Sequence, residues 1–170
     1  SQITPPVIDN SITANADTIE VNVKMLDEPL VVDITGNDVD NTPILLRGKG
    51  VGFNASSYGI IFPGDFDQGS VQSKFTWRPS CDTIDYEKNN VFHFQITLVD
   101  SLNKCRFYKA DTLVVAVTVE PPDKKEFIPP NVFTPNGDDK NAFFAMVEYD
   151  EINDTFINIL PDDDCFGKFV

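Results

Sequence analysis

The run VFHFQITLVD, residues 91–100, decides the fold class of this chain. Apolar and polar side chains alternate through it without a break. Because successive side chains of a strand point to opposite faces, this period of two predicts a β-strand with one face in a core. The apolar positions are Phe92, Phe94, Ile96 and Leu98, and the polar positions between them are His93, Gln95 and Thr97.

The same signal recurs on both sides of this run. Six further short apolar or alternating runs carry it: 18–24, 30–34, 44–46, 58–62, 74–77 and 113–119. Gly48 and Gly50 are expected to end the third of these, and Pro63-Gly64 the fourth. No segment has the period of a helix. Seven short strands separated by turns predict an all-β fold, with a β-sandwich over residues 15–121.

Segments that contain proline flank the predicted sandwich. Residues 1–14 have weak periodicity and are interpreted as a linker from a preceding module, with room for one edge strand. Pro121-Pro122-Asp123-Lys124-Lys125 is stiff and charged, so residues 122–127 are expected to be a second linker. Residues 128–170 then make a separate β-rich unit. In it, Pro135-Asn136-Gly137-Asp138 favours a turn before the apolar run 142–147, which indicates the start of a hairpin.

The charge of the chain narrows the classes of partner. The 170 residues are 41% hydrophobic, which is enough for a packed core, and carry a formal net charge of −14. Such a field repels phosphate backbones and anionic membrane surfaces, so no nucleic acid is expected as a partner. No apolar run approaches 18 residues, so no membrane insertion is expected. A secretory signal peptide is not found either, so secretion would require a longer parent chain.

Three segments of the predicted sandwich resemble a known repeat class. The run DITGNDVDNTPI, residues 33–44, is similar to the Asp-x-Asp-x-Asp-Pro-Leu segment of bacterial cadherin-like and Ig-like repeats. Residues 75–79, FTWRP, resemble the Trp-x-Pro strand end of these repeats, and Val99-Asp100 with the run 113–119 resembles their final hairpin. The resemblance implies an Ig-like or cadherin-like β-sandwich.

The acidic loops of the sandwich are candidates for calcium. Asp38, Asp40 and Asn41 lie in one loop, and Asp100 lies at the edge of another. Calcium takes six to eight oxygen ligands, and carboxylates at i and i+2 of a loop can converge on one ion. Cadherin-like repeats bind calcium at such loops, so the resemblance implies these four residues as ligands and calcium as the one cofactor. The alternative is a solvated acidic turn, because Asp and Asn suit turns in any case.

The three cysteines, Cys81, Cys105 and Cys165, fit no zinc-binding spacing. A Cys81–Cys105 disulfide would cross-link the sandwich, stabilise it by about 3 kcal/mol on a loop-entropy estimate, and imply an oxidising compartment. Trp77 is then expected to pack in the core near the bridge. The alternative is a pair of buried free thiols. Cys165 is left without a partner in this scheme.

The C-terminal unit carries a second resemblance. The run PNVFTPNGD, residues 130–138, resembles the opening of the gliding-motility-associated C-terminal domain, the type B sorting domain of the type IX secretion system. Asp139 and Ala142 depart from the family pattern, which has Gly and Asp there, and the later strand of the family module is absent. Residues 128–170 therefore resemble the first half of that domain. The motif residues that match are Pro130, Asn131, Phe133, Thr134, Pro135, Asn136, Gly137 and Asp138.

This resemblance implies a function and a location. The chain would be the C-terminal fragment of a large adhesin-like protein, secreted to the bacterial surface and associated with the outer membrane. The tail would be recognised by the type IX translocon and its barrel-shaped outer-membrane shuttle protein, and preceding repeats would adjoin the sandwich. The alternatives are a calcium-rigidified adhesion module and an accessory β-domain of a secreted enzyme. No catalytic site is expected in the chain itself, because its one histidine, His93, lies mid-strand without a nucleophile motif.

Bacteria with this secretion system attach O-glycans at Asp-Ser or Asp-Thr followed by an aliphatic residue. The resemblance therefore adds four candidate O-glycosylation sites: Thr18, Thr83, Ser101 and Thr112. The alternative is that Asp-Thr simply opens β-strands.

Overall fold

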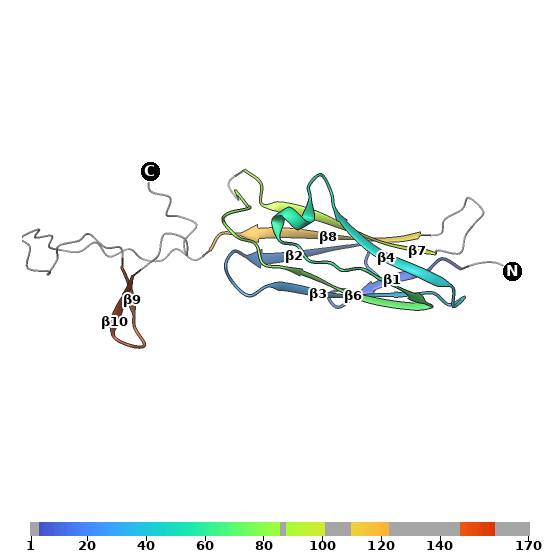
Figure 1. Cartoon of the computed structure of the whole chain (residues 1–170), viewed down its shortest axis with the longest axis horizontal. Helices are drawn as coiled ribbons and strands as arrows, with labels where there is room; N and C mark the ends of the chain where they lie inside the picture. The colour runs from blue at the N-terminus through green and yellow to red at the C-terminus, as the bar shows by residue number, and fades with distance from the viewer. Residues whose placement is uncertain (1–3, 86–87, 101–109, 123–146, 159–170) are drawn as a thin grey trace, which may run out of the picture. The chain divides into compact units, whose positions relative to one another are not determined.

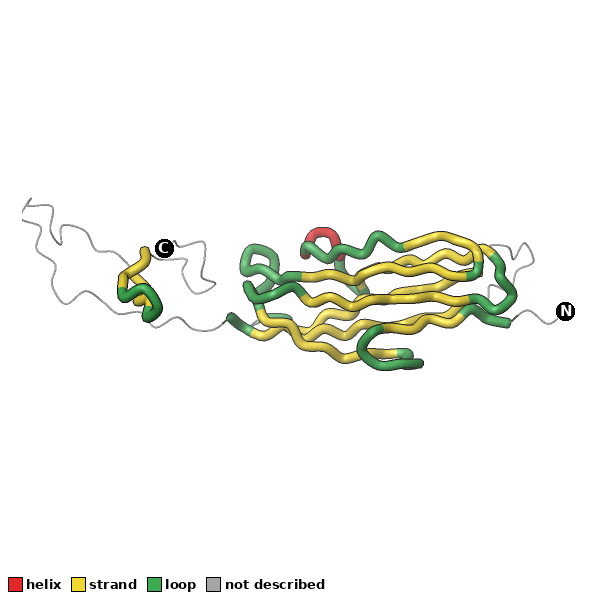
Figure 2. Tube along the Cα trace, turned by 90° about the horizontal axis from the view of Figure 1, so that it is seen from below, coloured by secondary structure: helices red, strands yellow, loops and turns green. Residues whose placement is uncertain are grey.

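The computed structural model describes residues 4–85, 88–100, 110–122 and 147–158. The chain divides into two compact units, Ser1–Pro121 and Pro122–Val170. The division falls at the proline pair that begins the predicted second linker. The first unit holds two sheets that face each other (Figures 1 and 2).

One sheet has three strands and the other has five. The three-stranded sheet has the order β1 (Val7–Asn10), β3 (Leu30–Asn37), β6 (Ser70–Trp77), with antiparallel pairs throughout. The five-stranded sheet has the order β2 (Thr18–Lys24), β8 (Ala110–Glu120), β7 (Val91–Asp100), β4 (Pro43–Gly50), β5 (Asp65–Gln68). Its pairs are antiparallel except for β2 and β8, which run parallel.

This strand order is that of an Ig-like sandwich. Strands β3 and β6 share one sheet while β4, β7 and β8 share the other, as in the two sheets of immunoglobulin-type domains. The N-terminal segment contributes to both sheets, through β1 on one side and β2 on the other. The predicted all-β sandwich is confirmed.

The core lies between the two sheets, and β7 supplies one row of it. Its four apolar positions are all buried, as the alternation predicts. Aromatic rings cross the interface: the ring centroids of Trp77 and Phe92 are 5.3 Å apart, and those of Phe75 and Phe94 are 5.1 Å apart. Tilted and edge-on ring pairs at these distances add to the stabilisation from burial alone. The indole of Trp77 is fully buried, as expected.

The prediction that Gly48 and Gly50 end the third strand is wrong. Strand β4 continues through both residues and pairs with β7 as far as Gly50 opposite Phe94. A Cβ atom at position 48 would lie 2.4 Å from Cε1 of Phe94 and 2.8 Å from Cδ1 of Phe62. Glycine at position 48 therefore makes room within the strand for the buried ring of Phe94 and the half-buried ring of Phe62.

The predicted strand at 58–62 is also wrong. A 3₁₀-helix, η1 (Ala55–Tyr58), occupies its start, and Gly59 ends the helix in the left-handed region at φ 74°. The Asn54 side chain caps the helix by accepting the backbone N–H of Ser56. Only Ile61 pairs in this stretch, in an isolated bridge to Thr76. The strand that follows, β5, gives no clear signal in the sequence, because it has only four residues and three of them are polar.

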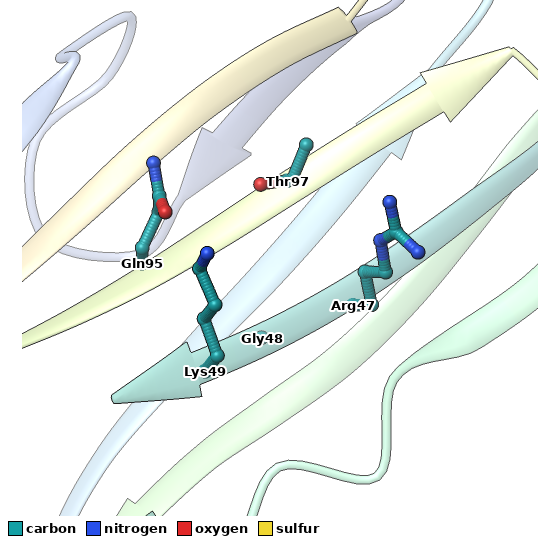
Figure 3. Close-up of a pocket in the computed structure, with 5 residues that line it drawn as sticks. All are labelled: Arg47, Gly48, Lys49, Gln95 and Thr97. Atoms are coloured by element: carbon teal, nitrogen blue, oxygen red, sulfur yellow. The ribbon is translucent and has the colours of Figure 1, made fainter. Parts of the chain in front are cut away.

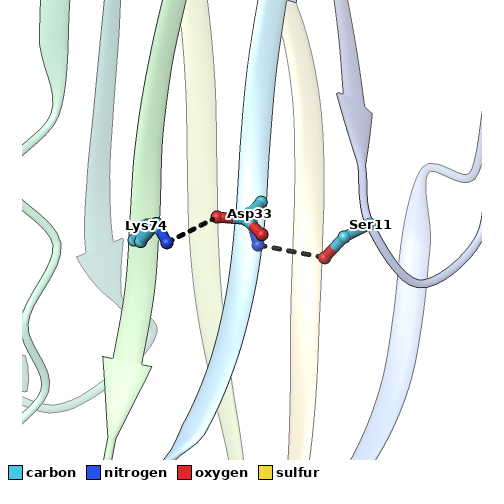
Figure 4. A network of polar contacts seen from close by, with 3 residues as sticks. All are labelled: Ser11, Asp33 and Lys74. Atoms are coloured by element: carbon cyan, nitrogen blue, oxygen red, sulfur yellow. Dashed lines mark hydrogen bonds and ion pairs between the residues drawn. The ribbon is translucent and has the colours of Figure 1, made fainter.

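Part of the predicted N-terminal linker belongs to the sandwich. Strand β1 is the edge strand for which that stretch had room, and Ile8 on it is 4% exposed. Just beyond β1, Ser11 and Asp33 exchange two hydrogen bonds of 3.0 Å, one from each backbone N–H. Figure 4 shows the bond that the Asp33 N–H donates to the Ser11 hydroxyl. The Asp33 carboxylate also contacts Nζ of Lys74 at 3.3 Å, in a solvated ion pair that contributes little to stability.

The second unit contains a hairpin of two short antiparallel strands, β9 (Val147–Asp150) and β10 (Thr155–Asn158). Asp154 lies in the connecting turn at φ 50°. The sorting motif 130–138 and the turn predicted within it lie outside the described residues. Across the described ranges, no helix is long and apolar enough to cross a lipid bilayer.

Candidate functional site

The turn between β3 and β4 carries three of the four predicted calcium ligands. Its backbone is held by the N–H of Asp38, which donates to the carbonyl oxygen of Gly69 at 2.8 Å. The Asp38 carboxylate accepts the backbone N–H of Asp40 at 3.1 Å and that of Thr42 at 2.9 Å, and it also accepts the Thr42 hydroxyl. Asn41 completes the turn at φ 55°. Asp38 is thus a turn-closing residue.

These contacts set the protonation of Asp38. Burial of the side chain would by itself raise the pKa of this carboxyl. The hydrogen bonds from the Thr42 hydroxyl and from the backbone of Thr42 and Asp40 outweigh burial, so the pKa lies below its ordinary value of 3.8. Asp38 is therefore ionised at neutral pH, and its charge is stabilised by donors of its own turn.

The other predicted ligands lie at the same end of the sandwich. Asp100 ends β7 opposite Ile44 and is 2% exposed. Asp40 accepts the backbone N–H of Thr4 at 2.6 Å. Within residues 4–85, 88–100, 110–122 and 147–158, no three His, Cys, Asp or Glu side chains are grouped to hold a metal ion. The described contacts show that Asp38 closes an acidic turn, and the calcium site stays a prediction.

Cys81 is disulfide-bonded, and its partner lies outside the described residues. The backbone places Cys81 at one end of the sandwich. Two residues earlier, the carbonyl oxygen of Pro79 accepts the N–H of Leu26, and the adjacent Met25 donates to Glu120, the last residue of β8. Cys81 therefore lies near the C-terminal end of β8.

The described residues that flank position 105, Asp100 and Ala110, lie at the opposite end of the same sheet. Asp100 ends β7 and Ala110 begins β8, each five residues from position 105. The 11 residues of β8 span about 33 Å, whereas five residues reach at most about 18 Å when fully extended. This topology weighs against the predicted Cys81–Cys105 pairing, which the spacing of the cysteines alone could not test.

The four glycosylation candidates fall in different environments. Thr18 is exposed at the start of β2, and Thr83 is exposed in the turn after Cys81. Thr112 is half-buried in β8 opposite Thr97. Ser101 lies outside the described residues, as do all eight matching residues of the sorting motif. Thr18 and Thr83 are the two described positions that an enzyme could reach most easily.

Sequence reasoning missed a basic surface on the five-stranded sheet. Arg47 and Lys49 project from β4 on the face away from the core, because Ile44 and Leu46 of the same strand point inward. On β7, Thr97 lies opposite Arg47 and Gln95 lies opposite Lys49. These four side chains and Gly48 line a depression of about 370 Å³, called the basic depression from here on (Figure 3). Figure 3 draws the four side chains on the same side of the two strands.

The signal for this surface was present in the sequence. The run RGKG, residues 47–50, continues the alternation of β4 with two basic residues on one face. Because the sequence prediction ends the strand at Gly48, it does not place Arg47 and Lys49 together on one face of the sheet.

Comparisons with known proteins leave the family of the chain open. No family model matches the sequence, and no curated protein does. Among solved structures, an ASH/PapD-like domain of human CEP192 gives a TM-score of 0.46 at 9% identity, covering 71% of this chain and 89% of that one. Human mucin-like protocadherin EC1-2 gives 0.45 at 14% identity, covering 68% of this chain and 54% of that one. The SrpA adhesin of Streptococcus sanguinis gives 0.41 at 10% identity, with 96% of each chain covered. At this level of similarity, none of them indicates what this chain binds.

Proposed function

We propose that the sandwich is a non-catalytic adhesion or stalk module of a larger bacterial surface protein, and that the tail is its export signal. One observation carries the first half: the chain enters and leaves the sandwich at opposite ends. Thr4 enters beside Asp40, at the end where β3 finishes and β4 begins. The chain leaves after Glu120, beside Met25 at the other end. Modules with this geometry can be joined head to tail into an extended array.

The surface and core suit the same role. The core between the sheets is apolar, and the depressions on the surface of the sandwich are open to solvent rather than enclosed. His93 lies exposed on β7 opposite Ala116. A binding or spacing module needs only such a stable scaffold with a recognition surface. We therefore propose no enzymatic activity for the sandwich.

The export half rests on the motif of residues 130–138 and its resemblance to the type B sorting domain. The proposed partners of the tail are the type IX translocon and its outer-membrane barrel shuttle protein, and the proposed location is the outer surface of the cell. The acidic charge of −14 suits a soluble surface protein that must not adhere to its own anionic membrane.

An adherence assay tests the adhesive role. A strain that produces the parent protein is compared with one whose parent lacks residues 15–121 but keeps the tail. We expect equal amounts at the surface, lower adherence of the deleted strain, and competition by the added 170-residue chain against the intact strain. Equal adherence of the two strains would contradict the adhesive role.

A further inference from the structure

The two basic side chains of the basic depression have no ion-pair partner among the described residues. The described residues include six basic side chains: Lys24, Arg47, Lys49, Lys74, Arg78 and Lys88. Lys74 and Lys88 pair with Asp33 and Asp85, Arg78 donates to two backbone carbonyl oxygens, and Lys24 also has a partner. In the described part of the chain, Arg47 and Lys49 are the two that have none. In a chain with 27 acidic and 13 basic residues, these two cations thus lie side by side without an acidic partner in the part of the chain that the structure describes.

The spacing of these cations is fixed by the sheet. Arg47 and Lys49 are two residues apart on one strand face, which places their Cα atoms about 7 Å apart. Like charges this close repel each other, and neither has an acidic cross-strand neighbour, since their partners on β7 are Thr97 and Gln95. An anion bound between them would relieve the repulsion and accept hydrogen bonds from both, in a bidentate pair with the Arg47 guanidinium.

The remaining groups of this face suit a sugar. Gln95 and Thr97 are half-buried and offer amide and hydroxyl groups, which can exchange hydrogen bonds with ligand hydroxyls. Phe66 on β5 lies opposite Leu45, on the same face as Arg47, and is 61% exposed. It is therefore a diagonal neighbour of Arg47, about 7–8 Å away, within reach of one ligand. An exposed ring beside polar groups provides an apolar surface for the C–H face of a pyranose.

Other anionic partners fit less well. A stable protein partner needs a buried centre that is mainly apolar. This depression is instead lined by charged and polar side chains. The net charge of −14 also repels large acidic partners at long range. A flexible oligosaccharide can reach the two cations within the screening length of about 8 Å at physiological salt.

We propose that the basic depression and Phe66 bind a carboxylated oligosaccharide, such as a segment of a uronic-acid polymer. Arg47 and Lys49 hold the carboxylates, Gln95 and Thr97 bond the hydroxyls, and Phe66 supports a sugar ring. This inference rests on the adhesive role proposed for the sandwich and gives that role a ligand class.

Titration calorimetry on the full 170-residue chain tests it, with a short oligogalacturonate as the probe and a neutral galacto-oligosaccharide as the comparison. The double variant Arg47→Gln/Lys49→Gln is set against Lys74→Gln/Lys88→Gln, which removes the same charge from paired sites elsewhere. We expect salt-sensitive binding of the oligogalacturonate by the wild-type and the control. The depression variant should bind at least about tenfold more weakly, the loss expected for a charge-assisted hydrogen bond. Phe66→Ala should weaken binding by a smaller factor.

Several results would overturn the proposal. These are equal binding by both double variants, equal binding of the neutral sugar, or no binding of the oligogalacturonate. Binding of a sulfated oligosaccharide alone would overturn the carboxylate assignment. Self-association that disappears in the depression variant would instead identify a second copy of the chain as the occupant. If both double variants compete equally for cell adherence, the adhesive role stands while this ligand site fails.

Discussion

The indole N–H of Trp77 donates a hydrogen bond of 2.8 Å to the backbone carbonyl oxygen of Tyr58, with the indole fully buried. Tyr58 is the last residue of η1, in the segment that joins β4 to β5 of the five-stranded sheet and bridges to β6 of the other sheet through Ile61 and Thr76. The bond therefore ties this segment to the C-terminal end of β6, and the rings of Trp77 and Phe92 on the facing sheet pack in a T-shaped pair. One side chain joins the η1 segment and both sheets.

Replacing this tryptophan should be costly. Trp77→Phe removes the donor, leaves the Tyr58 carbonyl oxygen without it, and opens a void, so we expect a loss of about 2–4 kcal/mol in the free energy of unfolding. Urea unfolding followed by circular dichroism measures it. Phe66→Leu, at an exposed ring, is the control and should change stability little. A loss of unfolding free energy smaller than that of the control would show that the buried indole and its hydrogen bond do not stabilise the sandwich.

Ser73 gives a prediction of opposite sign. Its side chain points into the core from β6, is 9% exposed, and its hydroxyl has no hydrogen-bond partner. Burial of an unpaired hydroxyl is unfavourable, so Ser73→Ala should stabilise the sandwich by about 1 kcal/mol and raise its Tm by several degrees. Ser70→Ala is the matched control on the same strand, since Ser70 is exposed and its hydroxyl is bonded to Asn37. A lower Tm for Ser73→Ala would mean that this hydroxyl is satisfied in solution.

Asp38 predicts a pH dependence of stability. Its folded pKa lies below the ordinary value of 3.8, so the carboxylate contributes stability that is fully present above that value. The contribution is lost as the pH falls through the folded pKa. Asp38→Asn should therefore be less stable than wild-type at pH 7, and the difference should shrink under acid conditions. Urea midpoints at neutral and acidic pH measure it, with Asp67→Asn as a charge-matched control on exposed β5. A difference that does not change with pH would contradict the role of the ionised turn.

The cysteines allow a covalent test of the topology. Because Asp100 and Ala110, which flank position 105, lie at the far end of the sheet from Cys81, we expect Cys105→Ser to leave Cys81 oxidised. Peptide mapping of the non-reduced chain should link Cys81 to a peptide other than that of Cys105, either that of Cys165 or one from a second chain. A linked pair of peptides containing Cys81 and Cys105 would contradict the strand ends described for β7 and β8.

The sequence predicts the sandwich well because the relevant signal is local. Alternation along β2, β7 and β8 reports burial directly, and all three strands lie where that period predicts them. Gly48 shows the limit, since glycine normally weakens a strand and here is required by rings that arrive from distant parts of the chain. β5 has too few apolar residues to give a period.

The candidate sites were harder to predict for a related reason. Acidic residues at i and i+2 look the same whether their oxygens face a cation or the backbone of their own turn. The turn-closing contacts of Asp38 with Thr42 are visible only in the folded structure. The basic depression depends on pairing between β4 and β7, which sequence spacing does not contain.

The central claim is that the sandwich is a self-contained surface module and that the tail is its export address. Protease accessibility on intact cells tests it most directly, with the parent protein compared to a version that ends at Pro122. The account predicts that the full parent is cleaved from the surface, while the truncated one stays inside the envelope with its sandwich folded. Truncated protein that is as accessible at the surface as the full parent would contradict the claim.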